Sequence, residues 1–420
     1  MISNATTTAA RRMHGMSVSP IRAMTGVIER AGGINLAQGL CRVAPPAELL
    51  DEALARIRTG PHTYGDAAGA HDLRVAIAEK LRDFNGLAID PETELVVSIG
   101  ATGALNAVLS ALFDPGDGVL LFEPYYGYHH SAVRLHDLDP QPVPCGRTLA
   151  LEPEAVREAI EPNTRAMILC TPANPSGIRF DREMLRAIEA IAVANDLLVI
   201  TDEIYEHIYF DERSHISPAS LPGLADRTLT ISGLSKTFSV PGWRLGYVAG
   251  PADLIRPIHI AADALFVCPP VPLQHIAEAA LRLPAAYYST LRTMYRDRMD
   301  TMAAEFERAG LQVRKPAGGY YLLCDFTDTG FTTGTAAAQH LLENHRVATV
   351  PGEAFCAGPA PFPFTRACFS VPLDDIARLR QLLRGFAIGA ASMTSVTPCS
   401  APRSTSSPIG DSKDRENSRW

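Results

Sequence analysis

Short, continuous runs of apolar residues alternate with amphipathic stretches along most of the chain. This is the pattern of β-α units around a sheet with both faces covered. The apolar runs predict buried strands at 95–98, 119–122, 166–169, 197–201, 229–231 and 247–249. Helical periodicity is clearest at 104–112, 183–195 and 274–283. Strands and helices that alternate in this way indicate an α/β fold with a mostly parallel sheet.

From about Tyr288 the pattern changes to a long charged helix, a strand-rich segment and a closing helix, at 288–309, 319–325 and 373–384. The change predicts a large domain over 47–287 and a smaller α+β domain over 288–390. We expect the N-terminal segment 16–46 to pack with the small domain. Both ends of the chain, 1–15 and 391–420, are polar and poor in residues that pack, which predicts disorder.

Composition narrows the class of protein. The chain has 420 residues, of which 46% are hydrophobic and 20% charged, as in a soluble enzyme of more than one domain. A formal charge of −8 without a basic stripe leads us to expect no nucleic-acid partner. We expect no membrane partner either, because no apolar run approaches the ~20 residues that cross a bilayer. The N-terminus lacks the apolar core of a secretory signal, so we expect a cytoplasmic location.

Cysteines and histidines suggest no metal centre. The eight cysteines include no C-x-x-C pair, so reduced and mostly buried thiols are favoured over a disulfide or zinc framework. His129-His130 has no cysteine or acidic ligand set near it in sequence. We therefore predict that the protein holds no metal.

Lysine is scarce, which makes Lys236 informative. Only four of the 38 basic residues are lysines. Lys236 follows the apolar run 228–231 and a Ser-Gly turn, so it should lie just past a strand end, where open α/β sheets bind ligands. A partly desolvated lysine amine can form an imine, whereas an arginine cannot. Lys80, Lys315 and Lys413 are less well placed, in a helical run, before a proline and in the polar tail.

The residues around Lys236 resemble a known attachment motif. Gly233-Leu234-Ser235-Lys236 is followed by Ser239-Val240 and by Gly242-x-Arg244-Leu245-Gly246. This segment resembles the pyridoxal-phosphate (PLP) motif of class I/II aminotransferases, and further similar segments run from Asn35 to Arg366. The resemblance implies the fold-type I architecture, which has a large domain with a mostly parallel seven-stranded sheet and a smaller α+β domain. It also implies PLP as the cofactor, held by Lys236 as an imine.

A phosphate site is expected where a strand, a glycine turn and an apolar helix start follow one another, at 97–105. Backbone N–H groups and the positive end of a helix suit a phosphate dianion. By resemblance, the phosphate is held by the amides of Ala101 and Thr102, the Thr102 hydroxyl, Ser235 (or Ser232) and Arg244.

The same resemblance assigns groups to the cofactor ring. Tyr126 in E-P-Y-Y-G-Y would stack on the ring, and Asn174 in T-P-A-N-P-S-G would donate to the phenolic oxygen. Asp202 ends a buried strand in V-I-T-D-E-I-Y and would keep the ring nitrogen protonated, while Tyr205 would bond the phenolic oxygen.

Three more positions concern the substrate and a second subunit. Arg366 resembles the arginine that binds the substrate α-carboxylate, a role that suits its fork of donors. The Gly39 backbone would face the same carboxylate, with Asn174 beside it. Tyr64 resembles the tyrosine that reaches the phosphate of the neighbouring subunit, which implies a homodimer with shared active sites.

The chain departs from the family pattern after Gly39. Many relatives have an aromatic residue or proline there and then an acidic residue, whereas this chain reads Leu40-Cys41-Arg42. Arg42 has two interpretations: it is a solvated loop charge, or it selects substrates with an acidic or phosphate-bearing distal group. Surface charges usually contribute little, which favours the first.

These features predict an aminotransferase that moves the amino group of an L-α-amino acid to a 2-oxo acid, with Lys236, Asp202 and Tyr205 as catalytic residues. The same fold supports other chemistry. One alternative is a lyase or synthase resembling aminocyclopropane-carboxylate synthases or β-C–S lyases, with S-adenosylmethionine as one candidate substrate. Another is the aminotransferase-like module of a transcription regulator, for which we expect too few residues before Gly32 to form a DNA-binding domain.

Overall fold

The computed structural model describes residues 10–14, 16, 25–26, 28 and 30–386. The disorder predicted at 391–420, and in most of 1–15, lies outside the described residues. None of the described helices has the length and hydropathy that a membrane span requires.

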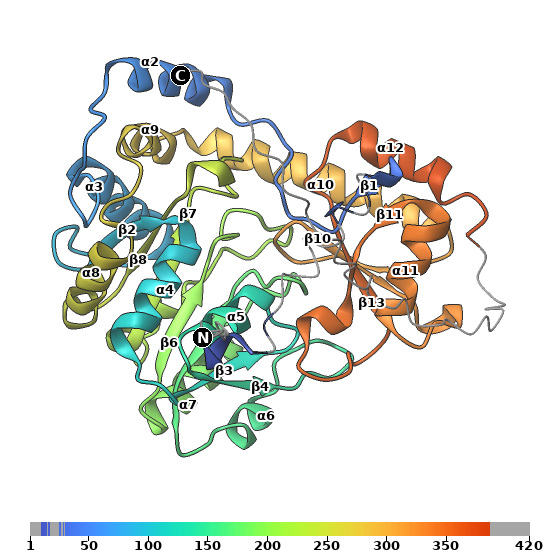
Figure 1. Ribbon diagram of the computed structural model, residues 1–420, viewed down its shortest axis with the longest axis horizontal. Coiled ribbons are helices and arrows are strands. Elements are labelled where there is room, and N and C mark those ends of the chain that lie inside the picture. The colour runs from blue at the N-terminus through green and yellow to red at the C-terminus, as the bar shows by residue number, and fades with distance from the viewer. Residues whose placement is uncertain (1–9, 15, 17–24, 27, 29, 387–420) are drawn as a thin grey trace, which may run out of the picture. The chain divides into compact units, whose positions relative to one another are not determined.

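A seven-stranded sheet runs through the part of the chain for which we predict cofactor binding (Figure 1). In spatial order its strands are β2 (Leu95–Ile99), β8 (Leu245–Ala249), β7 (Thr228–Gly233), β6 (Leu198–Asp202), β5 (Thr164–Cys170), β3 (Gly118–Phe122) and β4 (Asp139–Val143). β8 is antiparallel to both of its neighbours, and the other paired strands are parallel. The mostly parallel seven-stranded sheet is therefore confirmed, and each strand predicted for it is present.

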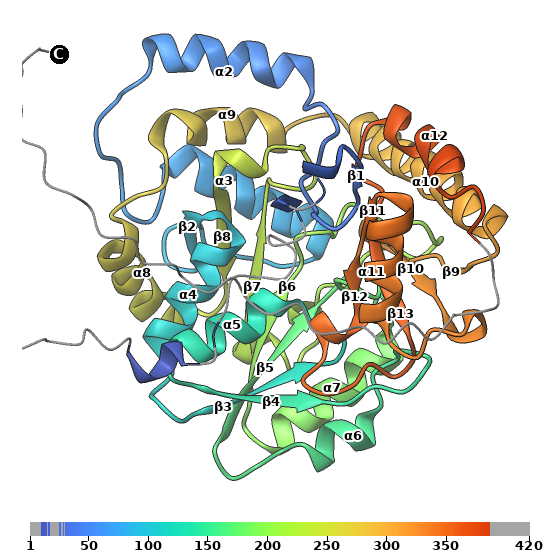
Figure 2. The same ribbon diagram turned by 45° about the vertical axis from the view of Figure 1, so that its right-hand side comes forward.

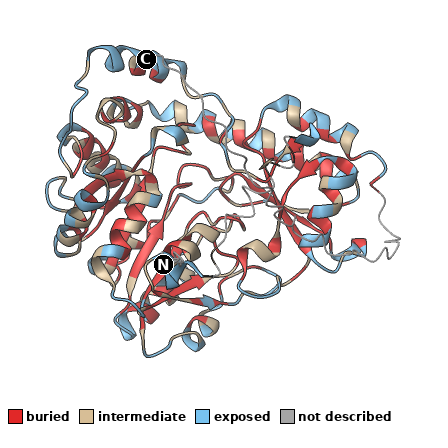
Figure 3. Cartoon of the chain, viewed as in Figure 1, coloured by how far each residue is buried: buried red, intermediate tan, exposed pale blue. Residues whose placement is uncertain are grey.

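The strands of this sheet are continuous apolar runs because both faces of the sheet are buried (Figure 3). Successive side chains point to opposite faces, so Val119 and Leu121 join one core cluster and Leu120 another. One face packs on α4 (Gly100–Leu112), α5 (Gly127–Leu135) and α8 (Ala252–Phe266). The other face packs on α3 (His71–Lys80), α6 (Pro153–Glu158), α7 (Arg182–Ala194) and α9 (Val271–Leu281), and α2 (Ala47–Thr59) packs through Leu49 on the same cluster as α9.

Two details of this sheet differ from the sequence prediction. Strand β4 reads D-P-Q-P-V and was not expected as a strand, because proline cannot donate to a ladder. It is tolerated because β4 lies at the sheet edge and pairs only with β3 (Figure 2). Helix α4 begins at Gly100 instead of at 104, so the glycine turn belongs to its first turn.

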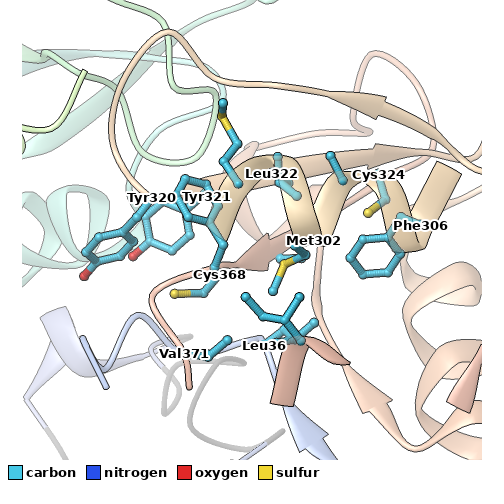
Figure 4. Packing of buried hydrophobic residues seen from close by; sticks show 14 of the residues in the cluster. Leu36, Met302, Phe306, Tyr320, Tyr321, Leu322, Cys324, Cys368 and Val371 are labelled. Carbon is cyan, nitrogen blue, oxygen red and sulfur yellow. The ribbon is translucent and has the colours of Figure 1, made fainter. Parts of the chain in front are cut away.

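A four-stranded antiparallel sheet follows in the order β12 (Val350–Pro351), β13 (Phe364–Cys368), β10 (Tyr321–Asp325) and β9 (Gln312–Arg314). It is accompanied by α10 (Ala285–Arg308), α11 (Gly334–His345) and α12 (Leu373–Leu382). Strand β1 (Ile34–Asn35) pairs in parallel with β11 (Val347–Ala348). The close-up in Figure 4 shows Leu36, from the N-terminal segment, packed in the same cluster as Tyr320, Tyr321 and Phe306. The predicted domain boundaries stay a prediction.

Candidate active site

A cavity of about 490 Å³ opens where β6 and β7 end and α4 begins. Its lining holds eleven of the twelve residues for which the sequence predicts a role, although they come from segments far apart along the chain. Those eleven residues are Gly39, Ala101, Thr102, Tyr126, Asn174, Asp202, Tyr205, Ser235, Lys236, Arg244 and Arg366. The twelfth, Tyr64, lies outside this lining and is 80% exposed.

Lys236 lies inside this cavity, three residues beyond the end of β7. Its Nζ donates to the backbone oxygen of Gly39 at 3.4 Å and lies 5.7 Å from the centre of the Tyr320 ring. Burial lowers the pKa of the Lys236 amine, because the charged form loses its hydration. A larger fraction of this amine is therefore neutral and nucleophilic than for a surface lysine.

Residues of the first turn of α4 and Arg244 lie together in the cavity lining. Gly100 has a φ of +68°, and a Cβ there would lie 2.6 Å from Nη2 of Arg244. That nitrogen donates to the Ile99 backbone oxygen at 3.4 Å, which holds the guanidinium beside the helix start. A helix N-terminus and a guanidinium together favour a phosphate dianion. Ser235 lines the cavity, whereas Ser232 donates to Glu206 Oε1 at 2.7 Å, so Ser235 is the serine that the geometry supports.

Asp202 ends β6, and its carboxylate is held in place by two partners. Its Oδ2 lies 2.9 Å from Nε2 of His129, and its Oδ1 accepts from the Ile204 backbone N–H at 3.2 Å. The Asp202 side chain is thereby fixed as a hydrogen-bond acceptor at the wall of the cavity. Sequence reasoning missed this role of His129, because nothing in the chain shows that α5 brings it to β6.

Two tyrosines from separate segments meet at the same cavity. The hydroxyl oxygens of Tyr205 and Tyr321 lie 3.2 Å apart, and burial raises the pKa of both phenols. A Cβ on Gly39 would overlap the Tyr321 hydroxyl, so the segment that carries Gly39 can lie this close only with glycine there. Tyr321 was also missed, since a pair of tyrosines in an apolar strand is typical of a core.

Arg366 is 1% exposed and lies on β13. Its Nη1 donates to Asn174 Oδ1 at 2.8 Å, its Nη2 donates to the Ala37 backbone oxygen at 2.6 Å, and its guanidinium stacks 4.1 Å from the centre of the Tyr321 ring. Its buried Nε has no hydrogen-bond partner among the described residues. A buried arginine held in one orientation, with a donor to spare, suits a carboxylate ligand.

A second buried polar cluster lies outside the cavity lining. Lys80 Nζ lies 2.5 Å from Glu206 Oε1, and Asn85 donates to Glu206 Oε2 at 2.8 Å. Glu203 accepts from Ser217 at 2.8 Å and lies 2.6 Å from His215 Nε2. Glu203, Glu206 and His215 could serve as metal ligands by type and spacing. Protein donors already engage both carboxylates, and the prediction that the protein holds no metal stays a prediction.

Similarity to known proteins identifies the family. Residues 31–383 match the family model Aminotransferase class I and II. The chain belongs to this family. It is 37% identical over 348 residues to a probable N-succinyldiaminopimelate aminotransferase of Mycobacterium tuberculosis, covering 82% of this chain and 88% of that one. It is 36% identical over 351 residues to the arginine–pyruvate transaminase of Pseudomonas aeruginosa, covering 83% and 87%.

Solved structures of aminotransferases have the same fold as this chain. The N-succinyldiaminopimelate aminotransferase structure from Mycobacterium tuberculosis superposes with a TM-score of 0.87 at 35% identity, covering 90% of this chain and 100% of that chain. A methionine aminotransferase of Escherichia coli gives 0.85 at 27% identity, covering 90% and 99%. This class I/II aminotransferase thus has the fold-type I architecture and uses PLP to transfer amino groups from amino acids to 2-oxo acids. These relatives are aminotransferases, which favours transamination over the lyase and synthase alternatives.

The residues of this aminotransferase fit PLP. The start of α4 beside Arg244, a lysine amine of lowered pKa and the Asp202 carboxylate lie at one cavity. Tyr126 lines the same cavity and supplies an aromatic face. The cavity lining therefore holds groups of the kinds that suit a phosphate, an aldehyde, an aromatic ring and a protonated ring nitrogen.

Proposed function

We propose that the lining residues carry out amino transfer in the roles that the resemblance implies. Ala101, Thr102, Ser235 and Arg244 would hold the PLP phosphate, Tyr126 would cover the ring, and Asn174 and Tyr205 would bond its phenolic oxygen. Bound PLP supplies an aldehyde that bonds to amines and a ring that withdraws electrons from the adjacent carbon. The observation that carries the proposal is the position of the Lys236 amine, in one cavity with Asp202 and Arg366.

Asp202, Lys236 and Arg366 would then have separate roles in the reaction. Asp202, oriented by His129, would keep the ring nitrogen protonated. Lys236 would take the proton from the substrate Cα and return it to the cofactor side, as general base and acid. Arg366 would fix the α-carboxylate, with the Gly39 backbone beside it, and so present the Cα proton to the amine.

Arg366→Lys tests the carboxylate role. A lysine keeps the charge but loses the two-pronged geometry, so we expect kcat/KM to fall about 10- to 100-fold, in line with the ~1.5–3 kcal/mol of a hydrogen bond to a charged group. Steady-state kinetics with several amino acids would measure it. The bound PLP content serves as the control and should stay at the wild-type level. An unchanged kcat/KM would remove Arg366 from the substrate site.

We also propose a homodimer in which Tyr64 reaches the phosphate in the partner's cavity. Tyr64 is 80% exposed, so its hydroxyl is accessible to a second subunit. The stripe Leu50, Leu54 and Ile57 on α2 is also exposed, at 41%, 60% and 45%.

Tyr64→Phe removes the hydroxyl and keeps the ring. We expect faster loss of PLP on dialysis with an unchanged sedimentation coefficient, because one phosphate hydrogen bond is lost and the interface is kept. Absorbance of the dialysed protein and analytical ultracentrifugation would show this. A monomer with full activity at assay concentration would contradict the shared site.

We propose a cytoplasmic enzyme whose partners are amino acid and 2-oxo acid substrates and a second copy of itself, with no nucleic acid or membrane partner. The formal charge of −8 supports the absence of a nucleic-acid partner. The seven cysteines of the described residues are free, as is typical of a reducing compartment. We also propose a large domain over 47–287 and a smaller domain over 288–390.

A further inference from the structure

The cations of the cavity already have roles. Among the described lining residues, the lysines and arginines are Lys236, Arg244 and Arg366. Their proposed roles are the amine chemistry, the phosphate and the α-carboxylate. A second acidic group, at the far end of a substrate side chain, would therefore meet no unassigned lysine or arginine there.

Arg42 does not supply the missing cation. Its Nη2 lies 3.0 Å from Asp375 Oδ2 and donates to the Asn35 backbone oxygen at 3.3 Å. The Arg42 backbone N–H donates to the Ser370 oxygen at 2.9 Å, and its side chain is not part of the cavity lining. The hypothesis that Arg42 selects acidic substrates therefore finds no support, and its charge is matched by Asp375.

Three uncharged residues of the lining adjoin the groups proposed to hold the substrate and the ring. Gln38 and Leu40 flank Gly39, and the Tyr128 ring lies 5.3 Å from that of Tyr126. Gln38 Oε1 accepts from Thr25 Oγ1 at 3.1 Å, and the amide NH₂ of Gln38 is a donor. Leu40 is 44% exposed. Together these three residues offer apolar surface and uncharged hydrogen-bond donors.

The two stretches of chain beside Tyr64, 60–65 and 267–270, contain no lysine or arginine. The Gly65 N–H donates to Cys268 Sγ at 3.5 Å, so the stretch 267–270 lies beside Tyr64. Neither that stretch, V-C-P-P, nor 60–65, G-P-H-T-Y-G, contains a lysine or arginine. In the proposed dimer, these two described stretches of the partner would bring no lysine or arginine with Tyr64.

We propose that the substrates carry uncharged side chains with an apolar stem and an acceptor near the end, such as a thioether or an amide, contacted by Gln38, Leu40 and Tyr128. A carboxylate there would lose its hydration without gaining a further lysine or arginine from the described lining residues. The inference rests on the proposed function of the cavity and narrows its substrate class.

The test uses the holoenzyme and only the half-reaction with the amino acid, so that no 2-oxo acid has to be added. The rate of change of the visible cofactor absorbance is measured over a concentration series of L-glutamine and of its isostere L-glutamate, with L-methionine as a second neutral substrate. We expect a specificity constant at least about 10-fold higher for glutamine than for glutamate, the lower end of what a hydrogen bond to a charged group contributes.

Two variants sharpen the test. Gln38→Lys places a cation on the same surface and is expected to shift the ratio toward glutamate by about 10-fold or more. Arg42→Ala, the matched removal of a cation outside the cavity, should leave the ratio unchanged. Glutamate equal to or better than glutamine in the wild type, or a ratio that changes with Arg42→Ala, overturns the inference. Absorbance that responds to no amino acid contradicts the proposed function itself.

Discussion

Lys236→Ala is expected to lower kcat by at least about 10²–10⁴-fold, the range that a positioned acid–base group contributes. Alanine would remove both the amine that we propose bonds the cofactor and the group that we propose moves the Cα proton. Single-turnover and steady-state assays of PLP-loaded protein would measure the loss. The visible absorbance band of the bound cofactor should also change, since it depends on the bond to this lysine.

Lys315→Ala is the matched control. Lys315 pairs with Asp300 at 2.8 Å on the surface, where its side chain is 44% exposed, and should be replaceable without loss of turnover. Full turnover by Lys236→Ala would contradict the assignment.

Lys80→Met is expected to lower the free energy of unfolding by about 3–5 kcal/mol, because it leaves the buried Glu206 carboxylate without its counterion. The side chains of Lys80 and Glu206 are 7% and 4% exposed. Equilibrium urea unfolding would measure the change. A double variant, Lys80→Met with Glu206→Leu, removes both charges and should recover much of the loss. A single variant as stable as the wild type would show that the pair does not stabilise the fold.

The Lys80–Glu206 pair also predicts how the free energy of unfolding depends on pH. Burial raises the pKa of Glu206, but Lys80 and nearby groups lower this pKa by more than burial raises it. The pKa of Glu206 therefore lies below its ordinary value. A carboxyl whose folded pKa is depressed stabilises the protein above its unfolded pKa, and this contribution is lost as the pH falls toward the folded value. The wild type should therefore lose more stability than the double variant between neutral pH and about pH 3. Urea unfolding of both proteins across this range would measure the difference, and equal losses would contradict the prediction.

The sequence predicted the parts of the site that local motifs encode. Lys236 and Arg244 share one motif, and Asp202 ends an apolar run, so strand-end placement followed from the pattern. His129 and Tyr321 were missed, because their roles arise from contacts with Asp202 and Tyr205 across 73 and 116 positions.

Two structural features were missed for related reasons. Strand β4 was not predicted because its prolines are acceptable only at an edge, and edge position is set by the order of strands in the whole sheet. Lys80 had the pattern of an ordinary helix residue, since no local signal pairs it with Glu206, 126 positions further along the chain. Contacts between distant segments therefore account for what the sequence did not predict.

The most direct test of the central claim is to find the lysine that bonds PLP. Borohydride reduction of the holoenzyme would fix the cofactor to its lysine, and peptide mass spectrometry after proteolysis would locate it. We predict the label on Lys236, in the peptide that contains S-G-L-S-K-T-F-S. A label on Lys80, Lys315 or Lys413 instead, or no covalent label on a PLP-loaded protein, would contradict the assignment of this cavity.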